Sequence, residues 1–349
     1  MNISKRFAER NRILSKKCSN ETVPGGVMLV TGHTPANVTL CVVPKAACTQ
    51  WLGLFKFLAN QNTSNKTLLE YSKFYIHDGG GKPYVRYKVN GKDKTFINNS
   101  HRVITARDPY TRLWSAYIDK FWLPSGWKDK GIQVIKMVRS NATSHSKSCG
   151  HDVTFSEFLQ YVINIGHSMN FWGYDYHWLP VTDICNPCKF NPHYIVKQET
   201  FFTDFKLILG RVGLLHVVEP KFTANQDEIE ISNEIDYAFR MYSHFQSCMN
   251  KTEFAERLWN AMIYNGYLQP EVEFPREFKE EVLKPEAVIR LVLEARKKHN
   301  IESRAEKAIR KQILSEVYSQ IPDAQIAALK QLYRLDFELF DYNSSPPIL

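Results

Sequence analysis

The sequence lacks three features that would define its class at once. It has no run of about 18 or more apolar residues of the kind that spans a bilayer, and no signal-peptide pattern opens it at Met1. It has no Gly-x-x-x-x-Gly-Lys-Ser/Thr segment, which disfavours a Walker-type ATPase or kinase. It has no repeat of about 20–50 residues, which excludes solenoids and propellers. One large globular α/β domain, or two domains, is therefore expected.

A complete zinc-ligand pattern is also missing. Cys185-Asn186-Pro187-Cys188 has the spacing of half a zinc site, but no second Cys-x-x-Cys or paired histidine motif completes it. We therefore expect no metal, and instead either a short disulfide-bonded loop or two cysteines that pair elsewhere. Cys41 and Cys48 are expected to be buried thiols. The odd total of seven cysteines leaves at least one thiol free.

Composition indicates a well-folded protein with an anionic partner. Hydrophobic residues make up 44% and aromatic residues 13%, which argues against disorder. The net charge of +9 suggests nucleic acid, a membrane surface, an acidic polysaccharide or a phosphate-rich cofactor. Sequons are several times more frequent than the roughly two or three expected by chance, which favours a glycosylated, lumenal or extracellular chain. They begin at Asn2, Asn20, Asn37, Asn62, Asn65, Asn98, Asn141, Asn250 and Asn343.

The first candidate site is the segment 38–51. Residues 38–43 predict a buried strand, Pro44-Lys45-Ala46-Ala47 a tight turn, and the residues from Thr49 onward an apolar helix. Such a layout is typical of a phosphate-binding loop, because free N–H groups and the helix dipole face the anion. Lys45 would add a point charge and Thr49 a hydroxyl. The alternative is an ordinary buried strand and turn.

A second strand–turn–helix segment follows at 102–121. Residues 103–106 predict a buried strand, Arg107-Asp108-Pro109 a turn, and residues 110–121 a helix. Pro109 suits the first helical turn and Asp108 an N-cap. Arg107 and Ser115 would form a second anion-binding corner. A nucleotide with phosphates at both ends would use both corners.

The rest of the chain gives coarser predictions. Residues 1–25 are interpreted as a stem or leader remnant, and residues 128–151 as a basic loop that is either solvated or contacts an acidic polymer. Thr154 to Glu157 predicts a helix start. Residues 194–196 predict a third buried strand, residues 225–320 charged helices, and residues 322–340 one last helix with an apolar face.

Four motifs in order resemble the carbohydrate sulfotransferases, in the branch with the HNK-1 and chondroitin/dermatan 4-O-sulfotransferases (sulfotransferase family 2). Pro-Lys-x-x-Cys-Thr-x-Trp at 44–51 looks like their 5′-phosphosulfate loop. Arg-Asp-Pro-x-x-Arg-Leu-x-Ser-Ala-Tyr-x-Asp-Lys-Phe at 107–121 looks like their 3′-phosphate motif. The third motif consists of His177-Trp178, Cys185, Cys188, Tyr194 and Lys197-x-Glu199-Thr200. The fourth motif is Leu-Tyr-x-x-Asp-Phe-x-x-Phe-x-Tyr at 332–342.

The resemblance implies a P-loop-like three-layer α/β sulfotransferase fold with a central parallel sheet and extra C-terminal helices. It implies a single domain over 26–349, in which 225–305 is a helical insertion atypical of the family. It further implies 3′-phosphoadenylyl sulfate (PAPS) as donor, no metal, and Lys45 stabilising the leaving phosphate. The implied donor-binding residues are Pro44, Lys45, Ala46, Ala47, Cys48, Thr49, Gln50, Arg107, Asp108, Pro109, Arg112 and Ser115. For Arg112, a surface ion pair is the alternative.

The implied catalytic base is His177, whose imidazole has a suitable pKa range for taking a proton from a sugar hydroxyl. Packing against Trp178 is its structural alternative. His77 is the second candidate, and Asp175 or Glu199 the third. The sequence departs from the family at Gln50 and Leu52-Gly53, where Asn and a Lys/Arg pair are usual, which leaves the acceptor open.

The predicted reaction is sulfuryl transfer to a glycosaminoglycan or glycoprotein glycan, with the 4-hydroxyl of N-acetylgalactosamine in chondroitin or dermatan first. Glucuronate 3-O-sulfation, a catalytically inactive glycan-binding relative and an ATP-dependent kinase are the alternatives. An acidic glycan rather than nucleic acid is the expected partner. The expected location is the Golgi lumen, as a type II membrane protein whose N-terminal anchor is absent from this sequence.

Overall fold

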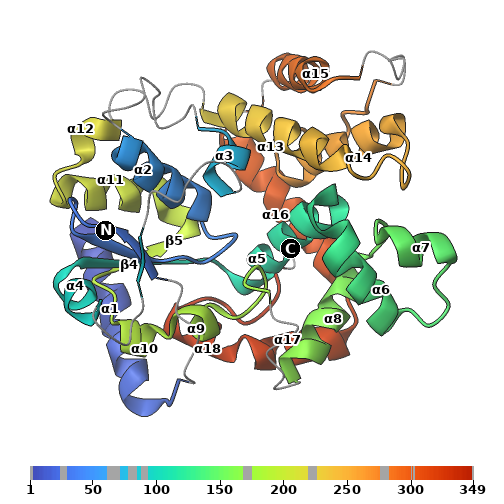
Figure 1. The fold of residues 1–349 in the computed structure, drawn as a ribbon. Coiled ribbons are helices and arrows are strands. Elements are labelled where there is room, and N and C mark those ends of the chain that lie inside the picture. Colours follow the sequence, from blue (N-terminus) through green and yellow to red (C-terminus); the bar gives the residue numbers. More distant parts are fainter. Residues whose placement is uncertain are drawn as a thin grey trace. The chain divides into compact units, whose positions relative to one another are not determined.

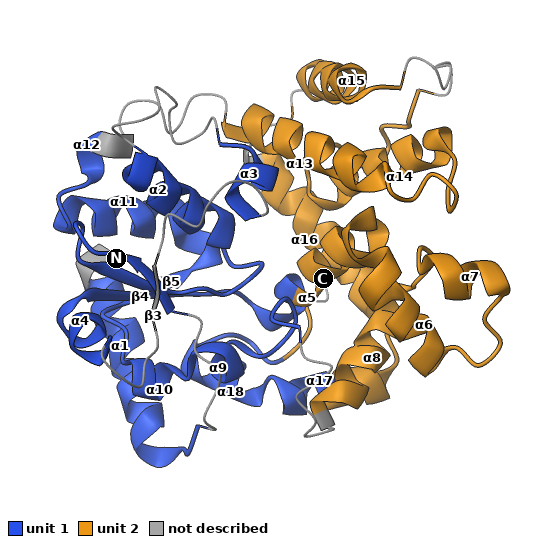
Figure 2. Cartoon of the chain, viewed as in Figure 1, with its two compact units in different colours: residues 1–112, 170–224, 329–344 blue, residues 113–169, 225–328, 345–349 orange. Residues whose placement is uncertain are grey.

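The computed structural model describes residues 3–23, 30–60, 71–77, 85–87, 93–167, 175–218, 226–275, 283–299, 301 and 303–347 (Figure 1). The chain divides into two compact units, coloured in Figure 2. Unit 1 comprises residues 1–112, 170–224 and 329–344, and unit 2 comprises residues 113–169, 225–328 and 345–349. The predicted stem at 1–25 and single domain over 26–349 stay predictions, and each unit is described by itself.

Unit 1 is built on a five-stranded mixed sheet with the order β3-β1-β2-β4-β5. β2 pairs with β4 and β4 with β5 in parallel, whereas β1 pairs antiparallel with both β2 and β3. The three predicted strands are confirmed as the parallel part of this sheet. The strands are β1 Val30–His33, β2 Val38–Cys41, β3 Val85–Tyr87, β4 His101–Ala106 and β5 Tyr194–Lys197.

Helices cover both faces of this sheet, which confirms the predicted three-layer α/β fold. Side chains alternate between the faces, so neighbouring residues such as Val103 and Ile104 are fully buried in two different apolar clusters. The first face carries α2 (Cys48–Asn60) and α11 (Phe201–Arg211). The second carries α9 (Val181–Cys185), α10 (Pro187–Phe190) and α18 (Arg334–Leu339), as Figure 1 shows.

The N-terminal segment, predicted as a stem or leader remnant, includes a helix that belongs to unit 1. Residues Ile3–Asn20 form helix α1, which packs along β5 and buries Phe7 and Leu14. Arg10 forms a buried ion pair with Asp204 of α11, with 2.6 Å between Nη1 and Oδ2. Its apolar face and this buried pair explain why the segment packs against the sheet, although its composition is polar and basic.

Three disulfides join distant parts of each unit. Neither cysteine of the Cys-x-x-Cys segment bonds to the other, so the alternative that each pairs elsewhere is confirmed and a zinc half-site is excluded. The expectation of buried thiols is wrong for both residues, since Cys41 is buried but disulfide-bonded and Cys48 is a free thiol that is only half-buried. The bonds are Cys18–Cys188 and Cys41–Cys185 in unit 1, and Cys149–Cys248 in unit 2.

The described elements of unit 2 are helical. The predicted basic loop at 128–151 contains two α-helices and most of the π-helical segment Trp127–Gly131. Its Arg139 is paired with Asp152 and Glu157 instead of facing solvent alone. The predicted helix start at Thr154 is confirmed, since the Glu157 N–H donates to its hydroxyl. The helices are α6 Ile132–Val138, α7 Ser144–Cys149, α8 Phe155–His167, α13 Gln226–Tyr242, α14 Lys251–Tyr264, α15 Pro285–Lys298 and α16 Ser303–Ser319.

The last predicted helix, 322–340, is two helices. α17 spans Asp323–Leu332 and α18 spans Arg334–Leu339, with Tyr333 between them. Within the described ranges, no helix is long and apolar enough to cross a membrane.

Candidate active site

The site begins at the edge of the sheet where the parallel strands of unit 1 end. Ligands of open α/β sheets bind outside the carboxyl ends of such strands. The Pro44–Ala47 turn follows β2, the Arg107-Asp108 turn follows β4, and a short helical turn, Gln198–Thr200, follows β5. The Arg107 guanidinium donates from Nη1 to the Lys45 carbonyl oxygen at 2.9 Å. The two predicted anion-binding loops of unit 1 are therefore joined by a direct bond.

The Lys45 turn has a backbone shape that suits an anion. Lys45 and Ala47 both have positive φ, 66° and 54°, a conformation that favours glycine. Left-handed residues in a turn let successive N–H groups point into one concavity. Ala46 between them is not among the residues with positive φ, and its N–H donates to Val43 O at 3.3 Å. Ala47 thus has the backbone conformation of a glycine, and the side chains of both alanines are buried.

Helix α2 begins at Cys48, directly after this turn, so its first N–H groups have no acceptor inside the helix. Together with the helix dipole they favour a negative charge at this point. The Thr49 hydroxyl lies in the same first turn. It is 2.9 Å from Nε2 of His77, at the end of helix α3 (Lys73–His77). The predicted phosphate-binding hydroxyl is therefore in contact with the second candidate base.

The Arg107 turn has the predicted cap. Asp108 Oδ1 accepts both the N–H and the hydroxyl of Thr111 at 2.8 Å, and helix α5 (Pro109–Tyr117) begins at Pro109. Burial raises the pKa of Asp108, and these two donors act in the opposite direction. The Asp108 carboxylate is thus committed to the helix end. Ser115 lies further along α5, in unit 2.

Arg112 has a different role from the one predicted. Its side chain is 1% exposed, so the alternative of a surface ion pair is wrong. Nε donates to Pro44 O at 3.0 Å, Nη2 to Tyr176 O at 2.7 Å, and Nη1 to Leu179 O at 2.5 Å. Burial lowers its pKa. Arg112 therefore ties the Lys45 turn to the turn at 175–179.

That second turn holds His177, the first candidate base. Its Nδ1 lies 2.5 Å from Asp175 Oδ1, and its backbone N–H donates to the same oxygen at 2.9 Å. A carboxylate in this position holds the proton of a neutral imidazole on Nδ1 and leaves Nε2 as the acceptor. Asp175, a third-choice base from sequence, is thus the partner that orients His177.

Comparison with known proteins identifies the family. A model of the "Sulfotransferase family" matches residues 30–252 and 241–343, which is more than half of the chain.

The chain belongs to the sulfotransferase family.

Its relatives confirm the resemblance found in the motifs. Carbohydrate sulfotransferase 14 of Danio rerio is 27% identical over 221 residues, 58% of this chain and 57% of that protein. Carbohydrate sulfotransferase 11 of Rattus norvegicus is 29% identical over 181 residues, 50% of each chain. Human carbohydrate sulfotransferase 9 is 30% identical over 179 residues, 50% of this chain and 39% of that protein. The chain thus spans about half the length of the curated relatives that it matches. No solved structure matches it.

In this sulfotransferase the C-terminal motif fixes the His177 turn, a role that sequence reasoning missed. The Tyr333 hydroxyl donates to the Trp178 carbonyl. The Asp336 carboxylate accepts the N–H groups of Val181 and Thr182 at 2.7 and 2.9 Å, and so caps α9. Burial raises the pKa of Asp336. The only signal in the sequence was that the motif recurs in the family.

Glu199, the other third-choice base, has partners of its own. Its Oε2 accepts the Tyr342 hydroxyl at 2.9 Å, and its Oε1 accepts the Asp108 N–H at 3.4 Å. Lys197 donates to the Asp341 carbonyl at 2.8 Å, and burial lowers its pKa. These residues link the end of β5 to the C-terminal segment and to the Arg107 turn.

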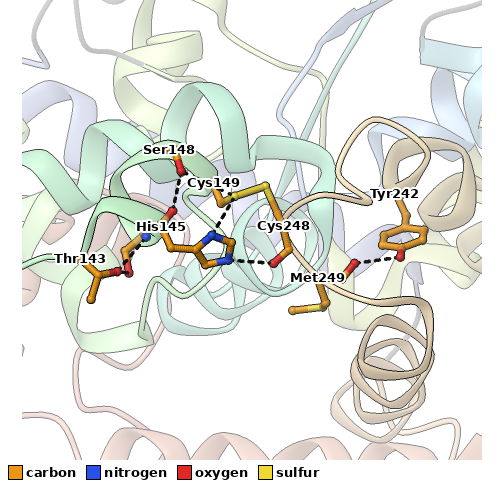
Figure 3. The surroundings of a disulfide bond; sticks show 8 residues. Thr143, His145, Ser148, Cys149, Tyr242, Cys248 and Met249 are labelled. Atoms are coloured by element: carbon orange, nitrogen blue, oxygen red, sulfur yellow. Dashed lines mark hydrogen bonds between the residues drawn. A yellow bond between two sulfur atoms is a disulfide. The ribbon is translucent and has the colours of Figure 1, made fainter.

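One group in unit 2 has the composition of a metal site. His145, Cys149 and His151 place one potential ligand atom each within 4.8 Å of the others. Figure 3 shows why the group does not fit a metal ion: Cys149 is bonded to Cys248, and His145 Nε2 lies 3.2 Å from the Cys248 carbonyl oxygen. A disulfide sulfur cannot supply the thiolate that such a site uses.

Proposed function

We propose that this chain transfers a sulfuryl group from PAPS to a sugar hydroxyl of a glycosaminoglycan or glycoprotein glycan. The first acceptor to test is the 4-hydroxyl of N-acetylgalactosamine in chondroitin or dermatan, and the alternative is the 3-hydroxyl of glucuronate. Family membership and the names of the relatives support sulfation of a carbohydrate. The observation that carries the proposal is the bond from Arg107 to Lys45 O, which unites two anion-binding loops.

The donor carries a phosphate on each side of its ribose, and the two loops match this. Lys45, the N–H groups at the start of α2 and the Thr49 hydroxyl would hold the 5′-phosphosulfate. Arg107 would hold the 3′-phosphate, because a guanidinium can offer two parallel N–H donors to one phosphate. From the motif, Ser115 is proposed to add a hydroxyl there. Such a grip on the remote phosphate distinguishes the donor from ATP.

In the proposed reaction His177 Nε2 takes the proton of the acceptor hydroxyl. The acceptor oxygen forms a bond to sulfur while the bond from sulfur to the 5′-phosphate oxygen breaks. That oxygen keeps the electron pair and gains negative charge, which Lys45 and the α2 N–H groups stabilise. The Asp175 carboxylate stabilises the imidazolium that forms.

The compartment is also part of the proposal. Disulfides persist in oxidising compartments, and the structure has three. Together with nine sequons they support a lumenal protein, and the reaction class suggests the Golgi with a type II membrane topology. The net charge of +9 suits an acidic glycan as partner.

The test is transfer of radiolabelled sulfate from PAPS to desulfated chondroitin, with disaccharide analysis of the product. Lys45→Ala should lower kcat by about 100-fold or more, because one charged donor to the leaving group is lost. The matched control is Lys94→Ala, an exposed lysine of helix α4 (Lys94–Asn99), which should leave transfer unchanged. Full activity of Lys45→Ala would refute the mechanism. Stabilisation by 3′-phosphoadenosine 5′-phosphate without transfer to any glycan would identify an inactive relative.

A further inference from the structure

A segment of unit 1 that no step of the proposed reaction uses follows helix α18. Asp341 is in the left-handed region, with φ 53°, and the Tyr342 N–H donates to Phe337 O at 2.8 Å. These are the features of a Schellman motif, which ends a helix and fixes the direction of the chain beyond it. Residues 341–344, named the C-terminal strap here, therefore leave α18 along one defined path.

Lys197 and Tyr110 hold the C-terminal strap at its two ends. Lys197, the last residue of β5, donates from Nζ to Asp341 O at 2.8 Å, and its Nζ lies 4.5 Å from the centroid of the Tyr342 ring. The hydroxyl of Tyr110, in the first turn of α5, donates to Ser344 O at 2.8 Å. The side chain of Tyr110 is buried, which fixes this donor. The strap is thus bound both to the end of β5 and to the helix that follows the Arg107 turn.

Tyr342 also reaches the Arg107 turn itself, through Glu199. Its hydroxyl donates to Glu199 Oε2 at 2.9 Å, and Glu199 Oε1 accepts the Asp108 N–H at 3.4 Å. This N–H belongs to the peptide bond between Arg107 and Asp108, so a partner on it restrains the backbone that carries the Arg107 side chain. Glu199 is exposed, and the Tyr342 hydroxyl limits the conformations that its side chain can adopt.

The charges around Arg107 show why the orientation of Glu199 matters. Burial raises the pKa of Asp108, and the charges of Glu199 and Arg107 act on it in opposite directions, so the three groups lie close together. A carboxylate at this place could pair with the Arg107 guanidinium and compete with a phosphate for it. The two oxygens of Glu199 instead accept from neutral donors, one hydroxyl and one N–H. Tyr342 supplies the first of these.

We propose that Tyr342 is a positioning residue for the donor: through Glu199 it holds the Arg107 turn in the shape that binds a 3′-phosphate, and so sets the preference of the chain for a nucleotide that carries one. This role rests on the function proposed above. It requires no contact between Tyr342 and the donor. It also gives a function to the last tyrosine of the motif at 332–342, which lies beyond the apolar face of the helices before it.

Calorimetric titration of the whole chain, without acceptor, tests this with two nucleotides as probes. The first is 3′-phosphoadenosine 5′-phosphate, and the second is adenosine 5′-phosphate, which lacks the 3′-phosphate. Tyr342→Phe keeps the ring over Lys197 and removes only the hydroxyl. It should raise the Kd of the first nucleotide by about tenfold, because a hydrogen bond to a charged group is lost, and leave the Kd of the second unchanged.

The matched control is Tyr242→Phe. The Tyr242 hydroxyl also makes a bond of 2.9 Å, to Met249 O in unit 2 (Figure 3), so this variant loses a comparable bond elsewhere. Both Kd values should stay unchanged in it.

Glu199→Ala tests whether Tyr342 acts through Glu199. This variant should also weaken the binding of 3′-phosphoadenosine 5′-phosphate, although the loss of a negative charge near Arg107 would by itself strengthen it. Adding Tyr342→Phe to Glu199→Ala should then have no further effect, because the hydroxyl has lost the group through which it acts.

The outcomes separate this proposal from the proposed function. An unchanged Kd in Tyr342→Phe, an equal rise for both nucleotides, stronger binding in Glu199→Ala, or additive effects in the double variant would each overturn the role of Tyr342. A parent chain that binds both nucleotides equally well would overturn the proposed donor and this role with it. A lost preference in Tyr342→Phe, in a protein that transfers no sulfate to any glycan, would support the role of Tyr342 while the proposed transfer reaction fails.

Discussion

Replacing Arg112 by lysine should weaken the fold and slow sulfate transfer together, because this one side chain joins the Lys45 turn to the His177 turn. The guanidinium reaches three backbone carbonyls, of Pro44, Tyr176 and Leu179, in two separate turns. Lysine keeps the positive charge but carries its donors on a single atom. The lysine ammonium can therefore donate to the carbonyls of only one of the two turns, and the other turn loses its hydrogen bond to residue 112.

The magnitude follows from the bonds lost. A buried hydrogen bond to a charged group contributes about 1.5–3 kcal/mol, so the loss of two of the three corresponds to about 3–6 kcal/mol of unfolding free energy. A shift of about 1 Å between catalytic groups can cost about 100-fold in rate. We expect kcat to fall by about 10- to 100-fold, with little change in the KM for PAPS, the proposed donor, because the Arg112 side chain is buried.

The matched control is Arg102→Lys. Arg102 lies in β4 of the same unit, and its guanidinium also donates to three backbone carbonyls, of Ile97, Asn98 and Asn191. None of these carbonyls belongs to the Lys45 or the His177 turn. This variant should lose comparable stability and keep its kcat at temperatures at which it remains folded.

Two assays on both variants test the reasoning. Urea unfolding followed by tryptophan fluorescence gives the loss of stability, and initial rates of sulfate transfer give kcat and KM. Equal losses of kcat in the two variants would show that reduced stability alone slows the enzyme. An Arg112→Lys protein as stable and as active as the parent would refute the proposed role of Arg112.

Three further predictions follow from the same structure. Burial and a neighbouring carboxylate raise the pKa of Asp183 to about 6, so the folded protein loses stability as this group ionises between about pH 4 and pH 6. Asp183→Asn should therefore raise the free energy of unfolding by about 1–2 kcal/mol at pH 7.5 and leave it unchanged at pH 4. Urea unfolding at the two pH values measures this difference. Ala47→Gly should raise the midpoint temperature of thermal unfolding, because glycine relieves about 1 kcal/mol of backbone strain at φ 54°. Ala46→Gly has no such strain to relieve and should lower the midpoint. A lower midpoint for Ala47→Gly than for Ala46→Gly would contradict the turn geometry. Asp175→Asn should lower kcat about tenfold or more and leave the KM for PAPS unchanged, because the amide no longer holds the proton of His177 on Nδ1. An unchanged kcat would contradict the assignment of His177 as the base.

Local sequence was sufficient wherever the interaction is short in range. The cap formed by Asp108 and the helix start at Thr154 were predicted, because each joins residues close together in the sequence. The three strands were predicted from their own apolar runs, whereas their parallel pairing joins segments that are far apart in the sequence. The single helix expected over 322–340 was wrong. Its apolar face continues through the break at Tyr333, whose hydroxyl binds the Trp178 carbonyl 155 residues away.

The motifs of the sequence determined the family, the two strand–turn–helix segments at 38–51 and 102–121, and the residues that could hold an anion. Only the tertiary structure decided what each of those residues does. It places Lys45 and Arg107 in contact, binds Arg112 to backbone carbonyls of two turns and makes Asp175 the partner of His177. The physical reason is that these roles depend on backbone carbonyls and N–H groups. Every residue carries such groups, so the letters of the sequence do not show which of them will lie within reach of a side chain.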